Sequence, residues 1–376
     1  MNAKEKIYQI ALSQAKGVGY MISSKLMARF GSAQAIFQAS PQELSKELGG
    51  KRVLAQAILS QRGLCEANEL WAAHSKADIR IITPWEEAYP KRLKHIYGVP
   101  TLLYMRGNAA LNRAKIISIV GTRRATAYGK KVVETLLSEL SAYPLLVVSG
   151  LAYGVDIHAH STALELGLPT LAVLAGGVDT IYPAPHKKVA EAMLAQGGLL
   201  SEHPFATKPQ AHQFAARNRL IAGIADATIV VEAGKKSGAL ITANYANEYD
   251  REVFAVGGSI YDPYSAGCHQ LIKTHQAHLL TSATDIVDAM NWDEEKVTAK
   301  CRPSVLASLP ELTEVERGTV QTIGRLQKEV HIDELSYQAQ IPPNQLGGIL
   351  LQLELKKIIR SLPGKKFRLA AYRGHY

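Results

Sequence analysis

The sequence is poor in cysteine and has no long apolar segment. Its 376 residues include three cysteines, Cys65, Cys268 and Cys301, which lie far apart and form no CxxC spacing. This pattern argues against a disulfide framework and against a zinc ribbon. No stretch approaches the ~18 apolar residues of a membrane span, and the first residues lack the pattern of a secretory signal. We therefore expect a soluble protein of the reducing cytoplasm, with no membrane partner.

Two common nucleotide-binding signatures are also absent. Seven residues separate Gly121 from Gly129, and Lys131 stands where a Walker A loop needs a magnesium-binding Ser or Thr. The same turn, GTRRAT, lacks the second glycine of a dinucleotide fingerprint. The sequence thus disfavours ATP hydrolysis, NAD and FAD, and we expect no cofactor.

The segment DIHAH, residues 156–160, has the residue types of a metal site. On a helix, however, Asp156 and His160 share a face while His158 projects away, so coordination by three ligands is geometrically poor. Asp156 is explained more simply by the positive end of a helix. We predict neither a metal site nor catalytic residues, because the other central carboxylates cannot be paired by spacing as acid and base: Glu202, Asp226 and Glu232.

The centre of the chain alternates apolar strands with amphipathic helices. Strands are predicted at residues 116–120, 145–149, 170–175, 198–201, 228–231 and 253–256. Helical spacing occupies residues 127–143, 154–167, 186–196, 211–224 and 238–249. Strands joined by crossover helices are parallel, so the pattern predicts an α/β fold with a doubly wound parallel sheet.

Glycine-bearing or serine-bearing turns follow these strands, and all of them fall on the carboxyl edge of such a sheet. Open α/β folds bind ligands along that edge. A formal net charge of +10 favours a polyanionic partner without proving one. The combination predicts a site for more than one phosphate, because basic residues gather in the same turns: Arg123, Arg124, Lys187, Lys188, Lys208, Lys235 and Lys236.

The segment HQFAARNRLIAG, residues 212–223, combines an aromatic ring with basic groups. At the start of a helix, Phe214, Arg217 and Asn218 lie on neighbouring faces, where they suit one strand of nucleic acid. In the alternative interpretation, Phe214 belongs to the core and Arg219 pairs with Asp226 or Glu202. The residue pattern leaves both interpretations open.

Domains of other kinds are predicted on either side of the centre. Residues 1–72 are helical, and AKGVGY at 15–20 fits either a helix-hairpin-helix or a plain helix–helix turn. Residues 77–290 form the α/β domain, and residues 291–310 read as a linker. The pattern in residues 311–376 predicts three helices followed by two short strands. These are the elements of a winged helix. Asn344 and Gln345 could contact DNA, although contact with a protein is an equal alternative.

Seven motifs occur in a fixed order: VGTRRAT, VSGLAYGVDIHAHSTAL, LAVLAGGVDTIYPAPH, GLLSEHP, FAARNRLIAGIAD, VVEAGKKSGALITA and REVFAVGGS. Together they resemble the DprA/Smf family of DNA-processing proteins, from about residue 89 to about residue 280. The resemblance implies an extended Rossmann-like domain, with a helix-hairpin-helix or SAM-like domain before it. It further implies single-stranded DNA binding, a homodimer and loading of the RecA recombinase during natural transformation, without catalytic turnover.

The resemblance also implies which residues bind DNA. Carried over motif by motif, they are Gly121, Thr122, Arg123, Ser149, Gly150, Lys187, Phe214, Arg217, Asn218 and Arg219. Gly257-Gly258 replaces the usual PG pair, which bears on loop geometry. The alternative function is a nucleotide N-glycosidase of the lysine-decarboxylase-like phosphoribohydrolases, but Ala243 and Asn244 stand near the place where that enzyme needs a glutamate.

Overall fold

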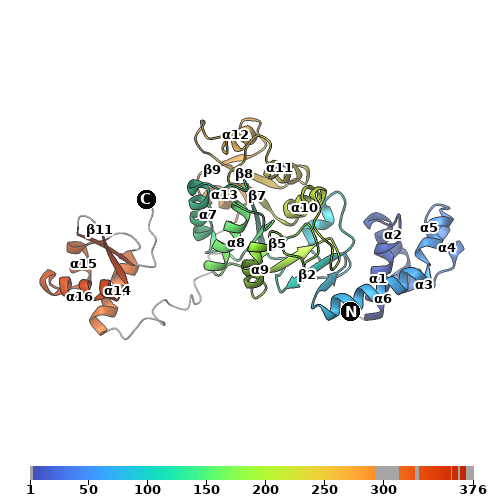
Figure 1. Ribbon diagram of the computed structural model, residues 1–376, viewed down its shortest axis with the longest axis horizontal. Helices are drawn as coiled ribbons and strands as arrows, with labels where there is room; N and C mark the ends of the chain where they lie inside the picture. The colour runs from blue at the N-terminus through green and yellow to red at the C-terminus, as the bar shows by residue number, and fades with distance from the viewer. Residues whose placement is uncertain (1–2, 293–312, 327–329, 357, 363–364, 370–376) are drawn as a thin grey trace. The chain divides into compact units, whose positions relative to one another are not determined.

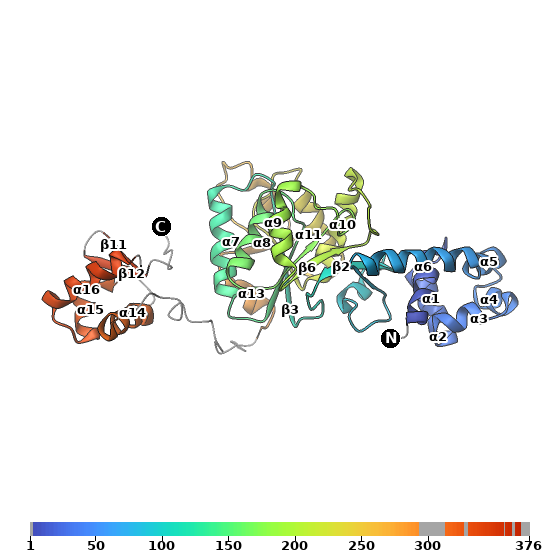
Figure 2. The ribbon, with the colours of Figure 1, turned by 60° about the horizontal axis from the view of Figure 1, so that its bottom comes forward.

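The computed structural model describes residues 3–292, 313–326, 330–356, 358–362 and 365–369. The chain divides into two compact units, Met1–Thr298 and Ala299–Tyr376 (Figures 1 and 2). Most of the predicted linker, residues 291–310, lies outside the described ranges. Within those ranges, every helix is too short or too polar to cross a membrane.

Six helices precede the first strand. Gly17, between the first two, has φ +87°, a backbone conformation that glycine adopts without strain, so the conformation of this turn favours glycine there. The helices are α1 (Ala3–Gln14), α2 (Tyr20–Phe30), α3 (Ala33–Gln38), α4 (Pro41–Glu47), α5 (Arg52–Ile58) and α6 (Gln61–Lys76). Helix α1 contacts the α/β region through the buried Lys6, which pairs with Glu86, and through Gln9, which accepts a hydrogen bond of 2.6 Å from Thr83.

A nine-stranded sheet forms the centre. In space the strands run β1-β2-β6-β5-β4-β3-β7-β8-β9. Strands β3 to β9 are parallel, which confirms the predicted α/β fold, whereas β2 pairs antiparallel with β6 and β1 antiparallel with β2. Their bounds are β1 (Arg80–Ile82), β2 (Leu103–Gly107), β3 (Lys115–Val120), β4 (Leu145–Ser149), β5 (Thr170–Val173), β6 (Gly198–Ser201), β7 (Ala227–Val230), β8 (Glu252–Val256) and β9 (His278–Leu280).

Helices cover both faces of this sheet (Figure 2). Alternate side chains of β3 point to opposite faces, so Ile117 and Ile119 join one apolar cluster while Ile116 and Val120 join another. The first cluster contains α7 (Ala127–Leu140), α8 (Val155–Glu165) and α13 (Ala283–Ala289). The second contains the 3₁₀ helix η1 (Lys91–His95) together with α10 (Ala211–Ile224), α11 (Gly238–Glu248) and α12 (Ala266–Lys273).

The chain order places a switch point between β3 and β7. From β3 the chain crosses to β4 on one side, whereas β7 lies on the other side of β3. Such a reversal leaves a crevice at the carboxyl ends of the two strands, because their following helices pack on opposite faces. The fold therefore places a ligand site directly above Val120 and Val230.

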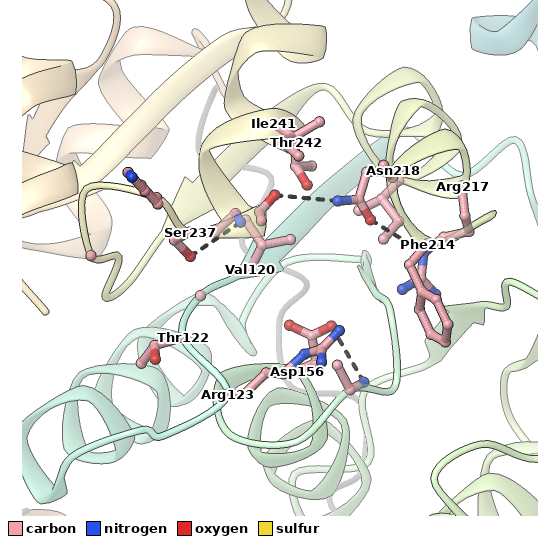
Figure 3. A pocket seen from close by; sticks show the side chains of 18 of the residues that line it. Val120, Thr122, Arg123, Asp156, Phe214, Arg217, Asn218, Ser237, Ile241 and Thr242 are labelled. Carbon is pink, nitrogen blue, oxygen red and sulfur yellow. Dashed lines mark hydrogen bonds between the residues drawn. The ribbon is translucent and has the colours of Figure 1, made fainter. Parts of the chain in front are cut away.

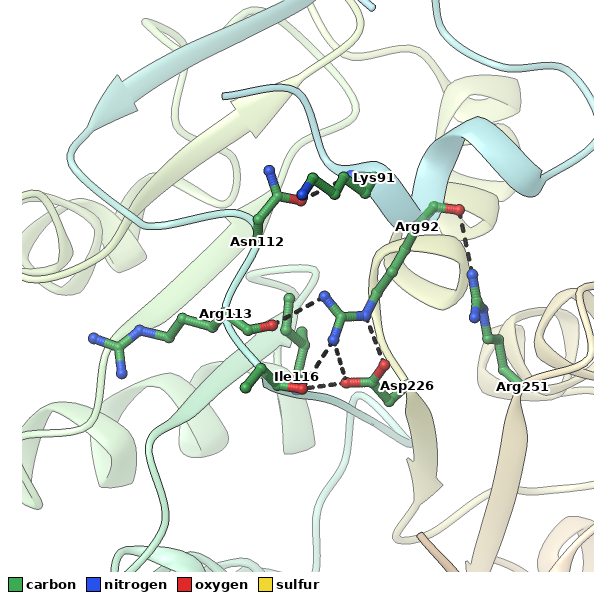
Figure 4. A network of polar contacts seen from close by, with 8 residues as sticks. Lys91, Arg92, Asn112, Arg113, Ile116, Asp226 and Arg251 are labelled. Carbon is green, nitrogen blue, oxygen red and sulfur yellow. Dashed lines mark hydrogen bonds and ion pairs between the residues drawn. The ribbon is translucent and has the colours of Figure 1, made fainter. Parts of the chain in front are cut away.

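At the amino ends of the same two strands, a polar network fastens them together (Figure 4). Arg92 of η1 forms a two-pronged ion pair with Asp226, at 2.6 and 2.8 Å. The second carboxylate oxygen of Asp226 also accepts a hydrogen bond of 2.9 Å from the Ile116 amide. Asp226 is thus the partner of Arg92, and the predicted alternative that paired it with Arg219 is wrong.

The second unit has the helices and strands of a winged helix, as predicted. Its apolar core includes Leu335, Leu346, Leu350 and Leu353. A strand that the sequence analysis did not predict, β10, pairs with β12 beside the predicted hairpin. The elements are α14 (Glu314–Leu326), β10 (Val330–His331), α15 (Ile332–Ala339), α16 (Pro343–Leu355), β11 (Ile359–Leu362) and β12 (Lys366–Leu369).

Candidate nucleic-acid interface

A pocket of about 580 Å³ opens at the switch point (Figure 3). It is lined by the turn at residues 120–123, by the first turn of α8, by α10 and by residues 234–242. Six of the predicted site residues line it: Gly121, Thr122, Arg123, Phe214, Arg217 and Asn218. Their contact with DNA stays a prediction.

The turn after β3 is held by backbone contacts on both sides. The Thr122 amide donates a hydrogen bond of 2.7 Å to the Glu232 carbonyl, and the Thr122 carbonyl accepts one of 3.1 Å from the Val155 amide. A side chain at Gly121 would place its Cβ 2.5 Å from the Val155 side chain, so this position needs glycine. The exposed Arg123 thus stands on a rigid turn.

Arg123 and Phe214 meet at the pocket. The guanidinium carbon of Arg123 lies 5.9 Å from the centroid of the Phe214 ring, within the range of a cation–π contact. Phe214 is half-buried, and its ring meets that of Tyr182 edge-on, with 5.7 Å between the centroids. A positive group and an aromatic ring therefore lie side by side where a ligand enters.

Arg217 is the least exposed of the basic residues that line the pocket. Its guanidinium donates hydrogen bonds to the carbonyl of Gly150, at 2.9 Å, and to that of Val173. Burial lowers the pKa of Arg217 to about 10, and the nearby Asp156 carboxylate opposes this change, so the group stays charged at neutral pH. Arg217 therefore ties together the ends of β4 and β5, and its contact with a phosphate stays a prediction.

The other four predicted residues, Ser149, Gly150, Lys187 and Arg219, do not line this pocket. Ser149 is fully buried and donates a hydrogen bond of 2.6 Å to the Ile119 carbonyl, so it stabilises the sheet. Arg219 points to the Gly98 carbonyl, at 2.7 Å, and to Glu202, because it lies on a different face of α10 from Phe214. This is the pairing with Glu202 that the alternative interpretation predicted.

Lys187 begins α9 (Lys187–Met193), with its side chain 70% exposed and 3.8 Å from Glu191. Like Ser149 and Arg219, it does not line the main pocket. Gly150 lines a small adjoining cavity instead, together with Phe214 and Arg217. Its amide donates a hydrogen bond of 3.1 Å to Asp156.

Two further pocket residues were not among those that the family resemblance assigned to DNA binding. Lys236 lies in the turn after β7 and belongs to the basic cluster predicted along this edge of the sheet. Tyr264 comes from the loop after β8, and its carbonyl accepts a hydrogen bond of 2.6 Å from the Ala233 amide. No local sequence signal marks Tyr264, because only the folded loop brings it to the pocket.

The carboxylates near the pocket are engaged by the protein itself. Burial raises the pKa of Asp156, whose oxygen accepts hydrogen bonds from backbone amides at Gly150 and Ala152. Glu232 is buried and accepts hydrogen bonds from the amide and hydroxyl groups of Thr126, which caps α7. Across the described ranges, no three His, Cys, Asp or Glu side chains gather closely enough to hold a metal ion.

Fold and site together define a class: an α/β protein with a basic, aromatic pocket at its switch point and a winged helix in a separate unit. Residues 80–291 match the family model "DNA recombination-mediator protein A", and residues 306–365 match "DprA winged helix domain". The chain belongs to the DNA recombination-mediator protein A family, known as DprA or Smf. The resemblance seen in the sequence motifs is confirmed.

Relatives of known name agree with this assignment. Protein Smf from Synechocystis sp. is 31% identical over 98% of this chain and 100% of its own length. DNA processing protein DprA from Bacillus subtilis is 43% identical over 58% of this chain and 74% of its own length.

Two solved structures are similar as well. DprA from Streptococcus pneumoniae has a TM-score of 0.59 and 31% identity, and the match covers 76% of this chain and 96% of that one. DprA from Helicobacter pylori, described for its single-stranded DNA binding mode, has a TM-score of 0.52 and 30% identity, over 57% and 96% of the two chains.

Proposed function

We propose that this protein is a DNA-processing protein that binds single-stranded DNA in the switch-point pocket. The observation that carries the proposal is the placement of the Arg123 guanidinium 5.9 Å from the ring of Phe214, on a turn held from both sides. Arginine supplies charge for a phosphate, and a ring supplies a surface on which a base stacks at ~1–3 kcal/mol without regard to sequence. The single-stranded DNA binding described for the Helicobacter pylori relative supports it.

The ring at the pocket explains a preference for single strands. A base stacks on Phe214 only when one of its faces is free, and the bases of a duplex cover each other's faces. Opening a duplex to free one base costs a few kcal/mol. The phosphate contacts alone act on either form of DNA, so the aromatic ring is the group that discriminates between them.

Titration of labelled oligo-dT across a range of salt concentrations tests the proposal. We expect tight, salt-sensitive binding, with duplex DNA a poor competitor. Arg123→Ala should weaken binding and reduce the slope of log K against log salt by about 0.7, the value for one lost contact to a single strand. Arg62→Ala is the matched control, because Arg62 is 87% exposed on α6, outside the pocket. Equal affinity of the Arg123 and Arg62 variants would remove the site assignment.

The proposal extends to RecA loading in natural transformation, to a homodimer and to a cytoplasmic location. Membership of the DNA recombination-mediator protein A family supports the first of these. Faster assembly of RecA on DNA coated with single-strand-binding protein tests the loading, and light scattering tests the dimer. We also propose the domain division 1–72, 77–290, 291–310 and 311–376.

The structure offers no observation that favours the N-glycosidase. Asp156 is the only carboxylate among the described lining residues of the pocket. One of its oxygens already accepts hydrogen bonds from two backbone amides. Ala243 is buried and Asn244 is exposed, and neither supplies an acid. We propose no catalytic turnover, and release of free base from AMP by the purified protein would overturn this.

A further inference from the structure

A second pocket of about 370 Å³ lies next to the first one, and Arg123 lines both. Its walls come from the turn after β3, the first turns of α7, and the loop that leads into α8. The residues that carry its chemistry are Arg123, Arg124, Lys130, Tyr153 and His158. The proposed function uses only Arg123 of these residues, and it assigns no role to Lys130, Tyr153 or His158.

The charge of the second pocket is positive. Arg123, Arg124 and Lys130 are all exposed, and none has an acidic partner within 4.0 Å in the part of the chain that the structure describes. The acid that pairs with a lining residue is Glu134, whose carboxylate lies 3.4 Å from the Nε2 atom of His158. Three unpaired cations against one carboxylate leave room for an anionic ligand.

An anchored aromatic ring borders the same pocket. Tyr153 is 47% exposed, and its ring meets that of His186 nearly edge-on, with centroids 4.8 Å apart. His186 is itself buried, with its Nδ1 atom 2.8 Å from the Leu151 carbonyl oxygen. The tyrosine is thus fixed by a buried neighbour while much of its surface is open. Such a ring is suited to stacking with an unpaired base.

A close backbone contact sets the position of Arg123 between the pockets. Gly154 has φ +80°, and a Cβ atom there would lie 2.5 Å from the carbonyl carbon of Arg123 and closer still to the Thr122 oxygen. Only glycine allows the loop of Tyr153 to approach the turn of Arg123 so closely. The contact between these two backbone segments therefore fixes Arg123, which lines both pockets.

We propose that the second pocket binds the next part of the same single strand of DNA, with a phosphate between Arg124 and Lys130 and an unpaired base on Tyr153. The strand then passes over Arg123, from the ring of Phe214 to the ring of Tyr153. This inference rests on the proposed function of the first pocket. It gives the strand a path across the protein, from the first pocket to the second.

Binding of two oligo-dT lengths by the full chain tests the inference. A strand of about four nucleotides fills one pocket, and a strand of about 16 reaches both. Tyr153→Ala should weaken binding of the long strand at least about fivefold and leave the short one unchanged. Phe214→Ala should weaken both. Tyr153→Phe should restore the long-strand affinity, and Tyr97→Ala is the matched control, since Tyr97 is 91% exposed and lines neither pocket.

Salt dependence separates a DNA contact from a structural effect. Arg124→Ala and Lys130→Ala should each reduce the salt slope of the long strand by about 0.7 and leave that of the short strand unchanged. If the unmodified chain binds neither strand, the proposed function itself fails. If it binds both strands and neither the Tyr153 nor the Arg124 variant changes long-strand binding, the second pocket is not part of the path, while the first remains.

Discussion

The guanidinium of Arg217 donates a hydrogen bond of 2.9 Å to the carbonyl oxygen of Gly150, in the loop that follows β4. Arg217→Ala leaves that carbonyl and the one of Val173 without their donor and leaves the buried Asp156 without its nearby cation. We expect a loss of about 3 kcal/mol in the free energy of unfolding, measured with urea.

Salt dependence of DNA binding tests the same variant a second way. Arg217 contacts carbonyl groups, so the slope of log K against log salt should match that of the unmodified protein, even where affinity falls. The conservative variant Arg217→Lys keeps the charge but not the planar fork, and should recover only part of the stability. A reduced slope would mean that Arg217 contacts a phosphate after all.

His160 should make stability depend on pH. Thr170 donates its hydroxyl proton to the Val147 carbonyl, so His160 must donate from Nδ1 to the Thr170 oxygen. The Nε2 atom of His160 is buried and has no hydrogen-bond partner among the residues that the structure describes. Burial lowers the pKa of His160 to about 3. Between about pH 6.5 and about 3 the unfolded chain binds a proton that the folded chain does not. The free energy of unfolding therefore decreases as the pH is lowered through this range, by about 1.4 kcal/mol per pH unit.

Unfolding by urea at several pH values checks this. His160→Asn can still donate to Thr170 but carries no titrating group. Its free energy of unfolding should therefore decrease less steeply as the pH is lowered, by about 1.4 kcal/mol per pH unit less than that of the unmodified protein. The difference between the two proteins isolates His160 from the other histidines. Parallel pH profiles would contradict the assignment.

Gly154 and Gly167 form a matched pair for testing backbone approach. Both have positive φ, +80° and +71°, but a Cβ atom at Gly167 meets no atom of the described residues within 4 Å, whereas one at Gly154 meets the turn of Thr122 and Arg123. Gly167→Ala should cost about 1 kcal/mol of unfolding free energy through strain alone. Gly154→Ala should cost more and should also weaken binding of single-stranded DNA. Thermal unfolding of both variants measures which one loses more unfolding free energy. Equal losses would show that the loop at Gly154 can move to accommodate a Cβ atom.

Removal of the second unit should leave the switch-point pocket intact. Every residue that lines the pocket lies between Val120 and Tyr264, within the unit that ends at Thr298. A chain without residues 299–376 should therefore keep its affinity for a short oligo-dT within about a factor of two, since separate units fold independently. A large loss in the same titration would show that the winged helix contributes to this site.

The sequence carried most of the information about the sheet and part of the information about the site. Apolar runs and helical spacing placed β3 to β8 and the helices between them within a few residues, because burial on both faces leaves a local signal. The antiparallel pairing of β2 with β6 left no such signal. This pairing depends on contacts between strands far apart in the sequence, because β6 pairs with β5 on one side and with β2 on the other.

Within the site, the turn of Arg123 and the ring of Phe214 were predicted, because strand order alone brings them to one edge. The bonds that Arg217 and Arg219 make within the protein could not be assigned from the motif, since a helix start distributes neighbouring side chains among different surroundings and a motif does not state which cation is buried. Tyr264 was missed because only loop closure brings it near.

The clasp of Arg92 and Asp226 completes a β3–β7 pair that is held at both ends. Its bonds fix the amino ends. At the carboxyl ends the Val231 amide donates to the Val120 carbonyl at 3.0 Å and the Thr122 amide to the Glu232 carbonyl at 2.7 Å. Under the proposed function, adjustment to a strand of DNA therefore falls to the side chains around the pocket, and the backbone amides of β3 should exchange with deuterium at the same slow rate in bound and empty protein.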